Sequence, residues 1–434
     1  MQVSRSQKLS SMLDLANLVY EFVRSQPSVK RVLVAFSGGV DSSVLLHAAA
    51  RAGLSQNLLA IHVNHQLSEY ANAWQQHCEQ FCRDMEVAGR SYRVSVIQQG
   101  KGLEEAARRA RMEVFAQCVG EGDLLLTAHH SGDQLETFFL RLARGAGVKG
   151  LSSMQKVRSF AEGQMGRPFL SVPQKVILAY ANRHNLSWVE DDSNCTTRFD
   201  RNFLRLDVLP KLTERWPAFE QQVNRSIELL DDDQRLLNGY VQQDFATLNL
   251  RAERLGHSLN LSALKAFDLV KQKALVRYGL SELSYSMPSK VRLVELASVL
   301  NAATDRSPEL HLGDCVLRRF KNRLYFLPTC WQQSSAILVP SDQGLKQGFD
   351  YTIVARKSLS GSLRSKPQSR GRSQTLKRLL QEYELEPWLR DSLPIVMCGD
   401  EVAAVGSLWV DEKYTSGDGD ALTLSFEYQS IDRN

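Results

Sequence analysis

In the first half of this chain, short apolar runs alternate with longer segments of helical periodicity, and no other feature restricts the fold as strongly. Four runs read as strands, at residues 31–36, 57–63, 91–96 and 123–128. Helical stretches are expected at residues 12–23, from 42 onward, and at 71–87, 103–118 and 133–144. The continuous apolar run VLVAF in the first strand is typical of a strand buried on both faces of a parallel sheet. The pattern therefore predicts an α/β fold with a doubly wound, mainly parallel sheet, whose ligands bind beyond the carboxyl ends of the strands.

The rest of the chain has a different character. Residues 218–245 and 261–300 show helical periodicity, and a strand–turn–strand pattern follows at 309–328. Short β-like runs return after that point. We predict three domains: the α/β domain over 1–217, a helical domain over 218–328, and a small mixed α+β domain over 329–434.

Composition excludes several classes of protein. The seven cysteines among 434 residues include no CxxC pair, which argues against a disulfide scaffold and against a two-plus-two metal site. No apolar run is long enough to span a bilayer. We expect a cytoplasmic protein with reduced thiols and no membrane association. The net charge of +5 is too small to identify a polyanionic partner, so the distribution of basic residues has to decide.

A glycine-rich loop follows the first strand and leads into a helix. Its residues are Ser37, Gly38, Gly39, Val40, Asp41 and Ser42. Paired glycines let backbone N–H groups approach a ligand, and the helix N-terminus favours phosphate. A Walker A loop would carry a lysine here, whereas this loop carries Asp41, and an acid beside phosphates is best explained as a ligand of Mg²⁺. The alternative is a loop that only caps the helix.

The pattern SGGxDS between a strand and a helix resembles the PP-loop of the N-type ATP pyrophosphatases. That resemblance implies a Rossmann-like PP-loop domain that splits ATP between its α- and β-phosphates and transfers AMP to an oxygen atom. The loop would then hold the pyrophosphate leaving group.

Other strand ends carry further candidate residues. His65 follows the second strand, at the edge that would hold adenine and ribose, although a lone histidine is as often structural. His129 follows the fourth strand. Asp133 and Glu136 come next, three residues apart on one helix face, and form a candidate pocket for a cation or an ammonium group. The alternative is an acidic first turn that stabilises the helix dipole, which would explain Asp133 but not the histidines.

Basic residues gather in several places. Arg108 and Arg111, on the helix at 103–118, suit an α-phosphate or an RNA backbone, or else form an exposed basic face. Residues 141–150 combine glycines with basic side chains at the sheet edge. Residues 351–381 contain eight Lys and Arg and no acid, a pattern that fits contact with a phosphate backbone and a solvated basic loop equally well.

Four blocks narrow the resemblance to the tRNA(Ile)-lysidine synthase family. They are TAHHSGDQLET running into RLARGAGVKGL (127–151), RPFL (167–170), WVEDDSN (188–194) and RNFLR (201–205). Gly132 departs from the family, whose members often carry an acid at this position. Met112 departs as well, where an aromatic residue is common.

The resemblance implies a chemistry and a set of roles. ATP adenylates the C2 carbonyl oxygen of the wobble cytidine in an isoleucine tRNA with a CAU anticodon, and the amine of free L-lysine then attacks C2 and displaces AMP to form lysidine. Catalytic residues would be Asp41, Asp133, Glu136, His129 and Arg205, with Asp41 holding Mg²⁺ and with Asp133 and Glu136 holding lysine. ATP would contact residues 37–42, His65, Arg108 and Arg111. The tRNA would contact Arg144, Lys149, Arg201, Asn202, Arg364, Lys366, Arg370, Arg372, Lys377 and Arg378.

Two other functions stay open at this point. One is a tRNA thiolase with the same loop, which the lack of a CxxC pair disfavours. The other is an RNA-binding protein with an inactive nucleotide site, which the intact loop disfavours. The sequence also leaves open whether the protein is a homodimer and which group accepts the proton of lysine.

Overall fold

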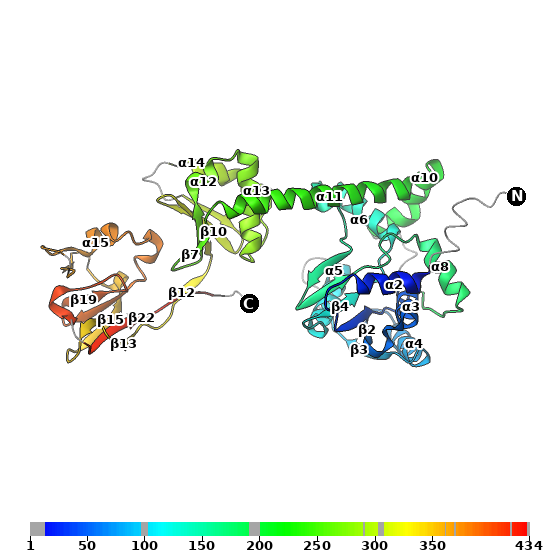
Figure 1. Ribbon diagram of the computed structural model, residues 1–434, viewed down its shortest axis with the longest axis horizontal. Helices are drawn as coiled ribbons and strands as arrows, with labels where there is room; N and C mark the ends of the chain where they lie inside the picture. The colour runs from blue at the N-terminus through cyan, green and yellow to red at the C-terminus, as the bar shows by residue number, and fades with distance from the viewer. Residues whose placement is uncertain are drawn as a thin grey trace. The chain divides into compact units, whose positions relative to one another are not determined.

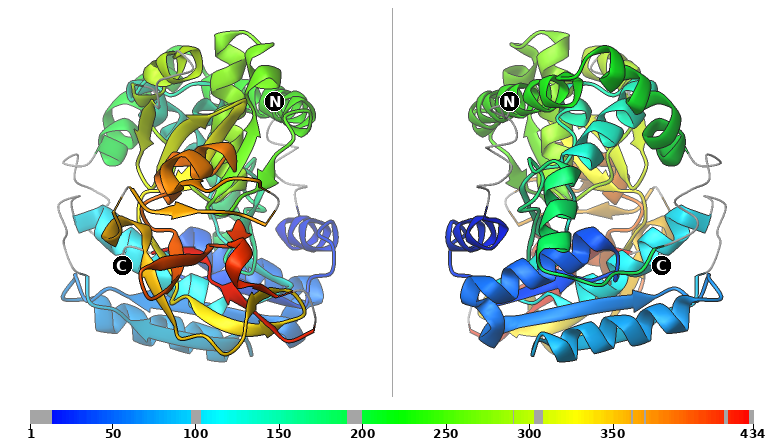
Figure 2. Two further views of the ribbon diagram at one scale, coloured as in Figure 1. Left: turned by 90° about the vertical axis from the view of Figure 1, so that its left-hand side faces the viewer. Right: turned by 90° about the vertical axis from the view of Figure 1, so that its right-hand side faces the viewer.

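The computed structural model describes residues 14–96, 103–190, 200–289, 291–302, 308–360, 362–368, 370–416 and 419–431. Its contacts divide the chain into two compact units, Met1–Leu236 and Leu237–Asn434. Figure 1 labels the elements of both units, and Figure 2 traces them from two further sides. The long helix α11 (Phe219–Ala246) begins in the first unit and ends in the second.

The N-terminal unit is built on a six-stranded sheet in the order β3-β2-β1-β4-β6-β5. Its strands are β1 (Arg31–Ala35), β2 (Leu58–Asn64), β3 (Ala88–Arg93), β4 (Asp123–Leu126), β5 (Val157–Phe160) and β6 (Gly163–Gly166). All neighbouring strands pair in parallel except β5, which runs antiparallel to β6. The predicted mainly parallel sheet is confirmed.

Helices pack on both faces of this sheet. One face carries α2 (Leu15–Arg24), α3 (Val40–Ala49), α4 (Ala71–Asp84) and α8 (Gln174–Arg183), and the other carries α5 (Leu103–Cys118). The unit also contains α6 (Ser131–Ala143), α7 (Val148–Leu151), α9 (Asp200–Phe203) and α10 (Leu209–Arg215). Alternate residues of β1 point to opposite faces, as the strand period requires. Val32 and Val34 join a core with α2, α3, α4 and α8, while Leu33 joins a second core with α5. A sheet buried on both faces confirms the doubly wound architecture.

The register of β1 and β4 is fixed where the two strands begin. Arg31 lies opposite Asp123, and its guanidinium forms a two-pronged ion pair with that carboxylate. Asp123 also accepts a hydrogen bond from the N–H of Gly120 (2.8 Å). A one-residue slip would break this pair and would turn every apolar side chain to the wrong face. The carboxyl ends of the strands are therefore held in line at the opposite edge.

The C-terminal unit begins with a small α+β region. A five-stranded antiparallel sheet, ordered β7-β8-β11-β10-β9, packs against three helices. The elements are β7 (Arg251–Ala252), β8 (His257–Asn260), β9 (Glu309–Leu312), β10 (Cys315–Phe320), β11 (Arg323–Pro328), α12 (Leu261–Lys265), α13 (Leu269–Glu282) and α14 (Leu296–Asn301). The helices and the strand–turn–strand were expected. The strands β7 and β8, with no alternating pattern of their own, were not.

The rest of this unit consists of small antiparallel sheets. They contain β12 (Trp331–Gln333), β13 (Ile337–Ser341), β14 (Gly344–Lys346), β15 (Tyr351–Ala355), β16 (Arg364–Ser365), β17 (Gln374–Thr375), β18 (Pro394–Cys398), β19 (Glu401–Val405), β20 (Trp409–Val410), β21 (Thr415–Ser416), β22 (Ala421–Ser425) and β23 (Tyr428–Ser430). One helix, α15 (Leu376–Glu382), packs its leucines against β18 and β19. This arrangement fits the mixed α+β segment expected after residue 328. Among the described residues, no helix is long and apolar enough to cross a membrane.

Candidate active site at the carboxyl edge of the parallel sheet

The loop between β1 and α3 is shaped by its own serines. The Ser37 N–H donates to Ser42 Oγ (3.2 Å), and the two serine hydroxyls lie 3.1 Å apart. Ser42 Oγ in turn donates to the carbonyl of Gly39 (2.9 Å). These bonds close a tight turn immediately before α3, whose N-cap is Gly39 without any side-chain cap. The first N–H groups of α3 are thus left for a ligand, as an anion site requires.

Gly38 is required by both conformation and space. Its φ of +87° is a left-handed conformation, and a Cβ there would lie 2.8 Å from Cys78 Sγ and 3.0 Å from Val189 Cγ2. Its carbonyl accepts a hydrogen bond from the Val189 N–H (2.9 Å). The loop is therefore packed against α4 through Cys78 and against the segment after α8 through Val189.

Asp41 lies in the first turn of α3 and faces α6. Its Oδ2 is 3.9 Å from His130 Nε2, while its Oδ1 is buried and has no hydrogen-bond partner. Burial raises the pKa of Asp41 above its ordinary value. A buried carboxylate oxygen without a partner is costly unless a ligand satisfies it. Among the described residues, no group of three or more His, Cys, Asp or Glu side chains is arranged to hold a metal ion.

The N-terminus of α6 brings a histidine and an acid beside Asp41. His130 is the N-cap, and its Nδ1 accepts a hydrogen bond from the Gly132 N–H (3.1 Å). The Nε2 atom of the same ring faces Asp133 Oδ2 at 3.6 Å. A Cβ on Gly132 would lie 3.0 Å from the His130 ring, so the missing side chain gives this ring its room.

Asp133 and Glu136 are both engaged by arginines. Arg201, from α9, donates to Glu136 Oε2 (2.5 Å) and to Asp133 Oδ1 (2.7 Å). Arg205, from the helical turn Leu204–Val208, donates to Glu136 Oε1 (2.6 Å) and lies 3.4 Å from Asp133 Oδ1. Glu136 is buried, and the two arginines are partly exposed. The result is a four-residue charge network on one face of α6.

This network shifts the pKa values of its members. Burial alone would raise the pKa of Asp133, but the charges of His130 and Arg201 outweigh it, and the pKa is lowered. Burial would lower the pKa of Arg205, but hydrogen bonding and charge from Glu136 raise it. Asp133 and Arg205 therefore both stay charged near neutral pH.

Two further histidines lie at strand ends. Burial lowers the pKa of His129 to about 4, and its Nδ1 lies 2.9 Å from Thr127 Oγ1. Burial, aided by the charge of Arg111, lowers the pKa of His65 to about 4, and His65 Nδ1 is buried without a partner. Both imidazoles are therefore neutral at physiological pH and can accept or donate a hydrogen bond but cannot attract an anion by charge.

The candidate residues of the N-terminal unit thus fall into two groups. The loop residues 37–42, Asp41, Asp133, Glu136, Arg201 and Arg205 meet in one place, connected through His130. Of the others, Arg108, Arg144 and Lys149 are exposed on α5, at the C-cap of α6 and on α7, and Arg111 and Asn202 are half-buried on α5 and α9. His65 and His129 are the histidines at strand ends described above. The expected residues 191–194 lie outside the described part of the chain.

The predicted RNA contacts of the C-terminal unit are not all equally available. Lys366 pairs with Glu412, and Arg370 and Arg378 share Glu382. Arg364 donates to Ser373 Oγ (3.2 Å). Arg372 and Lys377 are exposed, and neither pairs with an acid of the described residues. These basic residues surround the short β16–β17 pair and the start of α15.

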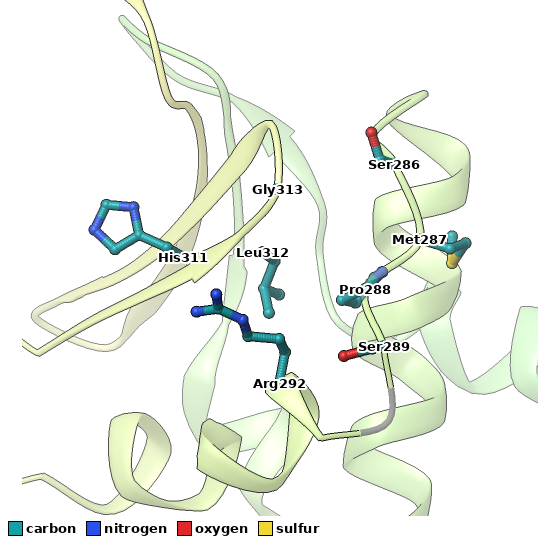
Figure 3. A pocket seen from close by; sticks show the side chains of 8 residues that line it. All are labelled: Ser286, Met287, Pro288, Ser289, Arg292, His311, Leu312 and Gly313. Carbon is teal, nitrogen blue, oxygen red and sulfur yellow. The ribbon is translucent and has the colours of Figure 1, made fainter. Parts of the chain in front are cut away.

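Two cavities lie apart from the network. One, of about 220 Å³, opens beside Phe36 between α4 and the strands β2 and β3, and His62, Cys78 and Glu79 line it. The other, of about 390 Å³, belongs to the C-terminal unit. Figure 3 shows the Arg292 side chain extending into it between His311 and the loop that carries Ser289. The residues that line the second cavity were not among the expected site residues.

Sequence reasoning missed two connections in this site. It assigned Arg201 to RNA, whereas in the structure the guanidinium binds the acidic pair. It also missed Glu220, at the start of α11, which accepts a hydrogen bond from the hydroxyl of Ser131 on α6. Neither connection has a local signal, because the partners are more than sixty residues apart in the chain.

Comparisons with known proteins agree with this arrangement. Three family models match the chain: "PP-loop domain" over residues 11–212, "TilS substrate binding domain" over 259–325 and "TilS substrate C-terminal domain" over 353–426. The tRNA(Ile)-lysidine synthase of Vibrio atlanticus is 39% identical, covering 90% of this chain and 95% of the relative. That of Vibrio parahaemolyticus is 38% identical, covering 91% and 94%.

Among solved structures, the U34-tRNA thiolase NcsA from Methanococcus maripaludis matches with 16% identity and a TM-score of 0.41. The match covers 50% of this chain and 78% of that one. A similarity this low carries no argument about either fold or function.

Proposed function

This chain belongs to the tRNA(Ile)-lysidine synthase family, and from that premise we propose that it joins free L-lysine to C2 of the wobble cytidine in the CAU-anticodon isoleucine tRNA. ATP is split to AMP and pyrophosphate in the process, through an adenylated cytidine. The observation that carries the proposal is the junction of the glycine loop with the charge network of α6, connected through His130 and Asp41. Phosphate recognition and ammonium recognition thus lie side by side.

The loop before α3 is suited to the leaving group of the first step. When the bond between the α- and β-phosphates breaks, negative charge develops on pyrophosphate. The free N–H groups of the loop and the helix dipole of α3 stabilise that charge. Asp41 would hold Mg²⁺, because its buried Oδ1 lacks a partner and a hard cation prefers oxygen ligands. Bound there, Mg²⁺ would offset charge repulsion between the phosphates and the RNA.

The acidic pair is suited to lysine. Asp133 and Glu136 present two carboxylates on one face of α6, already adapted to bind cationic nitrogen. The lysine ammonium would replace one guanidinium, and the displaced arginine could then bind the α-phosphate. One of the carboxylates, or the AMP phosphate, accepts the proton that the amine loses before it attacks C2. His129, which is neutral, would donate a hydrogen bond to the developing oxyanion.

The remaining assignments follow from the substrate. We assign residues 1–217 to catalysis and residues 218–328 and 329–434 to tRNA binding. The exposed Arg364, Arg372 and Lys377 would contact phosphates. His65 and Arg111 would contact the nucleotide, while the charge of Arg108, the third member of that predicted group, acts on the arginines near β6. A tRNA substrate also implies a cytoplasmic reaction.

One experiment tests the function directly. The protein is incubated with isoleucine tRNA, ATP, Mg²⁺ and isotopically labelled lysine, and the tRNA is digested and analysed by mass spectrometry. We expect a single cytidine to gain the mass of lysine minus water, with pyrophosphate released in step. A thiolase would release pyrophosphate without incorporating lysine. An RNA-binding protein with an inactive nucleotide site would release none, and either result would contradict the proposal.

A further inference from the structure

Arg167 is a buried charge without a counter-charge. It follows β6 at the carboxyl edge of the parallel sheet, and only 6% of it is exposed. Its Nη1 donates to the carbonyl of Gln155 (2.7 Å), its Nη2 lies 3.3 Å from Met165 Sδ, and its Nε is buried without a partner. Both acceptors are uncharged. A buried guanidinium is normally paired with a carboxylate, since the desolvated charge is otherwise costly.

Other arginines gather around it. On β5, antiparallel to β6, Arg158 lies opposite Met165, and its Nη2 is 3.6 Å from the same sulfur atom that Arg167 contacts. On α6, Arg141 donates to the carbonyls of Gly150 (2.7 Å) and Ser153 (2.8 Å), which are again uncharged. The two guanidiniums of Arg158 and Arg167 therefore meet at one atom, where their charges repel.

We call Arg108, Arg141, Arg158 and Arg167 the arginine cluster. Burial and the charges of the other three members lower the pKa of Arg167 to about 10. Arg108 also lowers the pKa of Arg141 and of Arg158, after burial. Within the described residues, no carboxylate forms an ion pair with any member of the cluster. Four mutually repelling cations without an acid form a site that an anion would complete.

The sheet order places Arg167 relative to the glycine loop and the acidic pair. In the order β1-β4-β6, the glycine loop follows β1, the acidic pair follows β4 and Arg167 follows β6. Strands are spaced by about 4.8 Å, so the end of β6 that leads into Arg167 lies on the other side of β4 from the end of β1 that leads into the loop. The charges of Arg167 and Arg108 reach His129, where they help to lower its pKa. Because the loop is the proposed binding site of the ATP phosphates, the arginine cluster is available to bind a second polyanion.

We propose that the arginine cluster binds a backbone phosphate of the RNA beside the nucleotide that is modified. This inference rests on the proposed function and adds a contact that anchors the RNA strand at the opposite flank from ATP. The planar fork of arginine matches phosphate oxygens in two-pronged geometry, and such contacts position a strand without reading its sequence. The base would then reach the site between the two anions.

The first test removes one exposed member of the cluster. Arg158→Gln should weaken binding of isoleucine tRNA about tenfold and reduce the slope of log affinity against log salt by about one, as the loss of one phosphate contact predicts. The affinity for ATP should stay unchanged. Arg24→Gln, which removes an exposed arginine from the last turn of α2, is the charge-matched control and should bind tRNA like the wild type.

The second test separates binding from structure. Arg167→Gln should bind tRNA more weakly while its Tm equals or exceeds that of the wild type, because an uncompensated charge is removed from the interior. A lower Tm with unchanged tRNA affinity would identify Arg167 as structural and overturn the inference. Weaker ATP binding with unchanged tRNA binding would assign the cluster to the nucleotide and overturn it as well.

The wild-type protein, measured in parallel, distinguishes failure of the arginine cluster from failure of the proposed function. If it modifies tRNA while both variants bind tRNA normally, the arginine cluster alone is refuted. If the wild type neither binds nor modifies the tRNA, the proposed function fails, and this inference fails with it.

Discussion

The two glycines of the loop after β1 have different physical reasons to be glycine. Gly38 has a positive φ and no room for a Cβ, whereas Gly39 has an ordinary φ of −72° and only Ser37 Oγ, at 3.5 Å, near its Cβ position. The sequence shows both as equivalent members of one motif. The structure separates them: Cys78 and Val189 pack against Gly38 and leave no room for a side chain, whereas the space around Gly39 is open to a ligand.

This difference predicts that alanine destabilises the protein at position 38 but not at position 39. Gly38→Ala should lower the free energy of unfolding by about 2 kcal/mol or more, from backbone strain plus the clash with Cys78. Gly39→Ala, the matched control, should leave stability within about 0.5 kcal/mol of the wild type. Urea denaturation of both variants measures this, and equal losses in the two would contradict the packing argument.

Asp41 carries a prediction about chemistry. Because burial already disfavours its charged form, Asp41→Asn should fold with undiminished Tm but release no pyrophosphate from ATP in the presence of tRNA. Binding of tRNA should survive. Pyrophosphate release, Tm and tRNA affinity are measured together, and a simultaneous loss of all three would show that the residue is structural.

Asp133 carries a prediction about lysine. Asp133→Asn removes one of the two carboxylates that would hold the ammonium, so the KM for lysine should rise at least tenfold. The first step, lysine-independent pyrophosphate release with tRNA, should continue. Initial rates at varied lysine concentration measure the effect. An unchanged KM in this variant and in Glu136→Gln would remove lysine from the assignment.

At the scale of elements, α3 and α8 are joined by a buried histidine. Nδ1 of His47 on α3 lies 2.9 Å from the hydroxyl of Tyr180 on α8, and the ring of His184, tilted by 42°, lies 4.9 Å from the His47 ring. Burial, with a smaller effect from the charges of His184 and Arg51, lowers the pKa of His47 to about 4. The helix pair is therefore packed around a neutral imidazole.

The pH dependence of stability follows from that value. The unfolded chain binds a proton at His47 below about pH 6.5, while the folded protein does so only near pH 4, so acid favours the unfolded chain. Between pH 7.5 and 5, this one group should cost about 2 kcal/mol of unfolding free energy. His47→Phe should lose less stability over the same range in urea denaturation. An equal loss would show that His47 does not cause it.

The elements also show what periodicity can and cannot predict. The buried strands β1, β2 and β4 were located within two residues, because continuous apolar runs have one structural explanation. The third strand was expected at 91–96 but is Ala88–Arg93, since half-exposed residues leave no boundary signal. The hairpin of β5 and β6 was missed altogether. Its sequences, VRSF and GQMG, are strands only because β4 offers an edge.

At the scale of the whole molecule, net charge is a poor guide to RNA contacts. Of the six basic residues expected to bind tRNA between 364 and 378, three are paired with acids that lie elsewhere in the sequence. A count of charges along the chain cannot detect Glu412 as the partner of Lys366 or Glu382 as the partner of Arg370, although Arg378 and Glu382 are four residues apart on one helix. The composition therefore identified the region as basic but could not show which of its basic side chains are free to contact RNA.

That pairing predicts unequal effects on tRNA binding. The double variant Arg372→Gln, Lys377→Gln should reduce the salt slope of tRNA binding by about two, because both side chains are exposed and unpaired with described acids. The double variant Lys366→Gln, Arg370→Gln removes the same charge from paired positions and should change the slope less. Titrations at several salt concentrations compare them, and a reversed order would contradict the ranking.

The same limit applies to the active site. The spacing of Asp133 and Glu136 correctly placed both carboxylates on one helix face, since three residues make nearly one turn. Their partners Arg201 and Arg205 come from a later segment, and the sheet and its crossovers bring the two segments together. A local pattern can therefore name the acids, but only the tertiary fold shows what neutralises them.

The contact between α6 and α11 determines where an isolated catalytic fragment of this protein can end. Glu220 accepts from the hydroxyl of Ser131, and Asn224 donates to its carbonyl (3.4 Å), so the first turn of the connecting helix completes the first turn of the helix that bears the acidic pair. An excised catalytic fragment ending at residue 217 would lose both partners. A minimal catalytic fragment therefore has to extend beyond residue 224, into the segment that the sequence assigned to the helical domain.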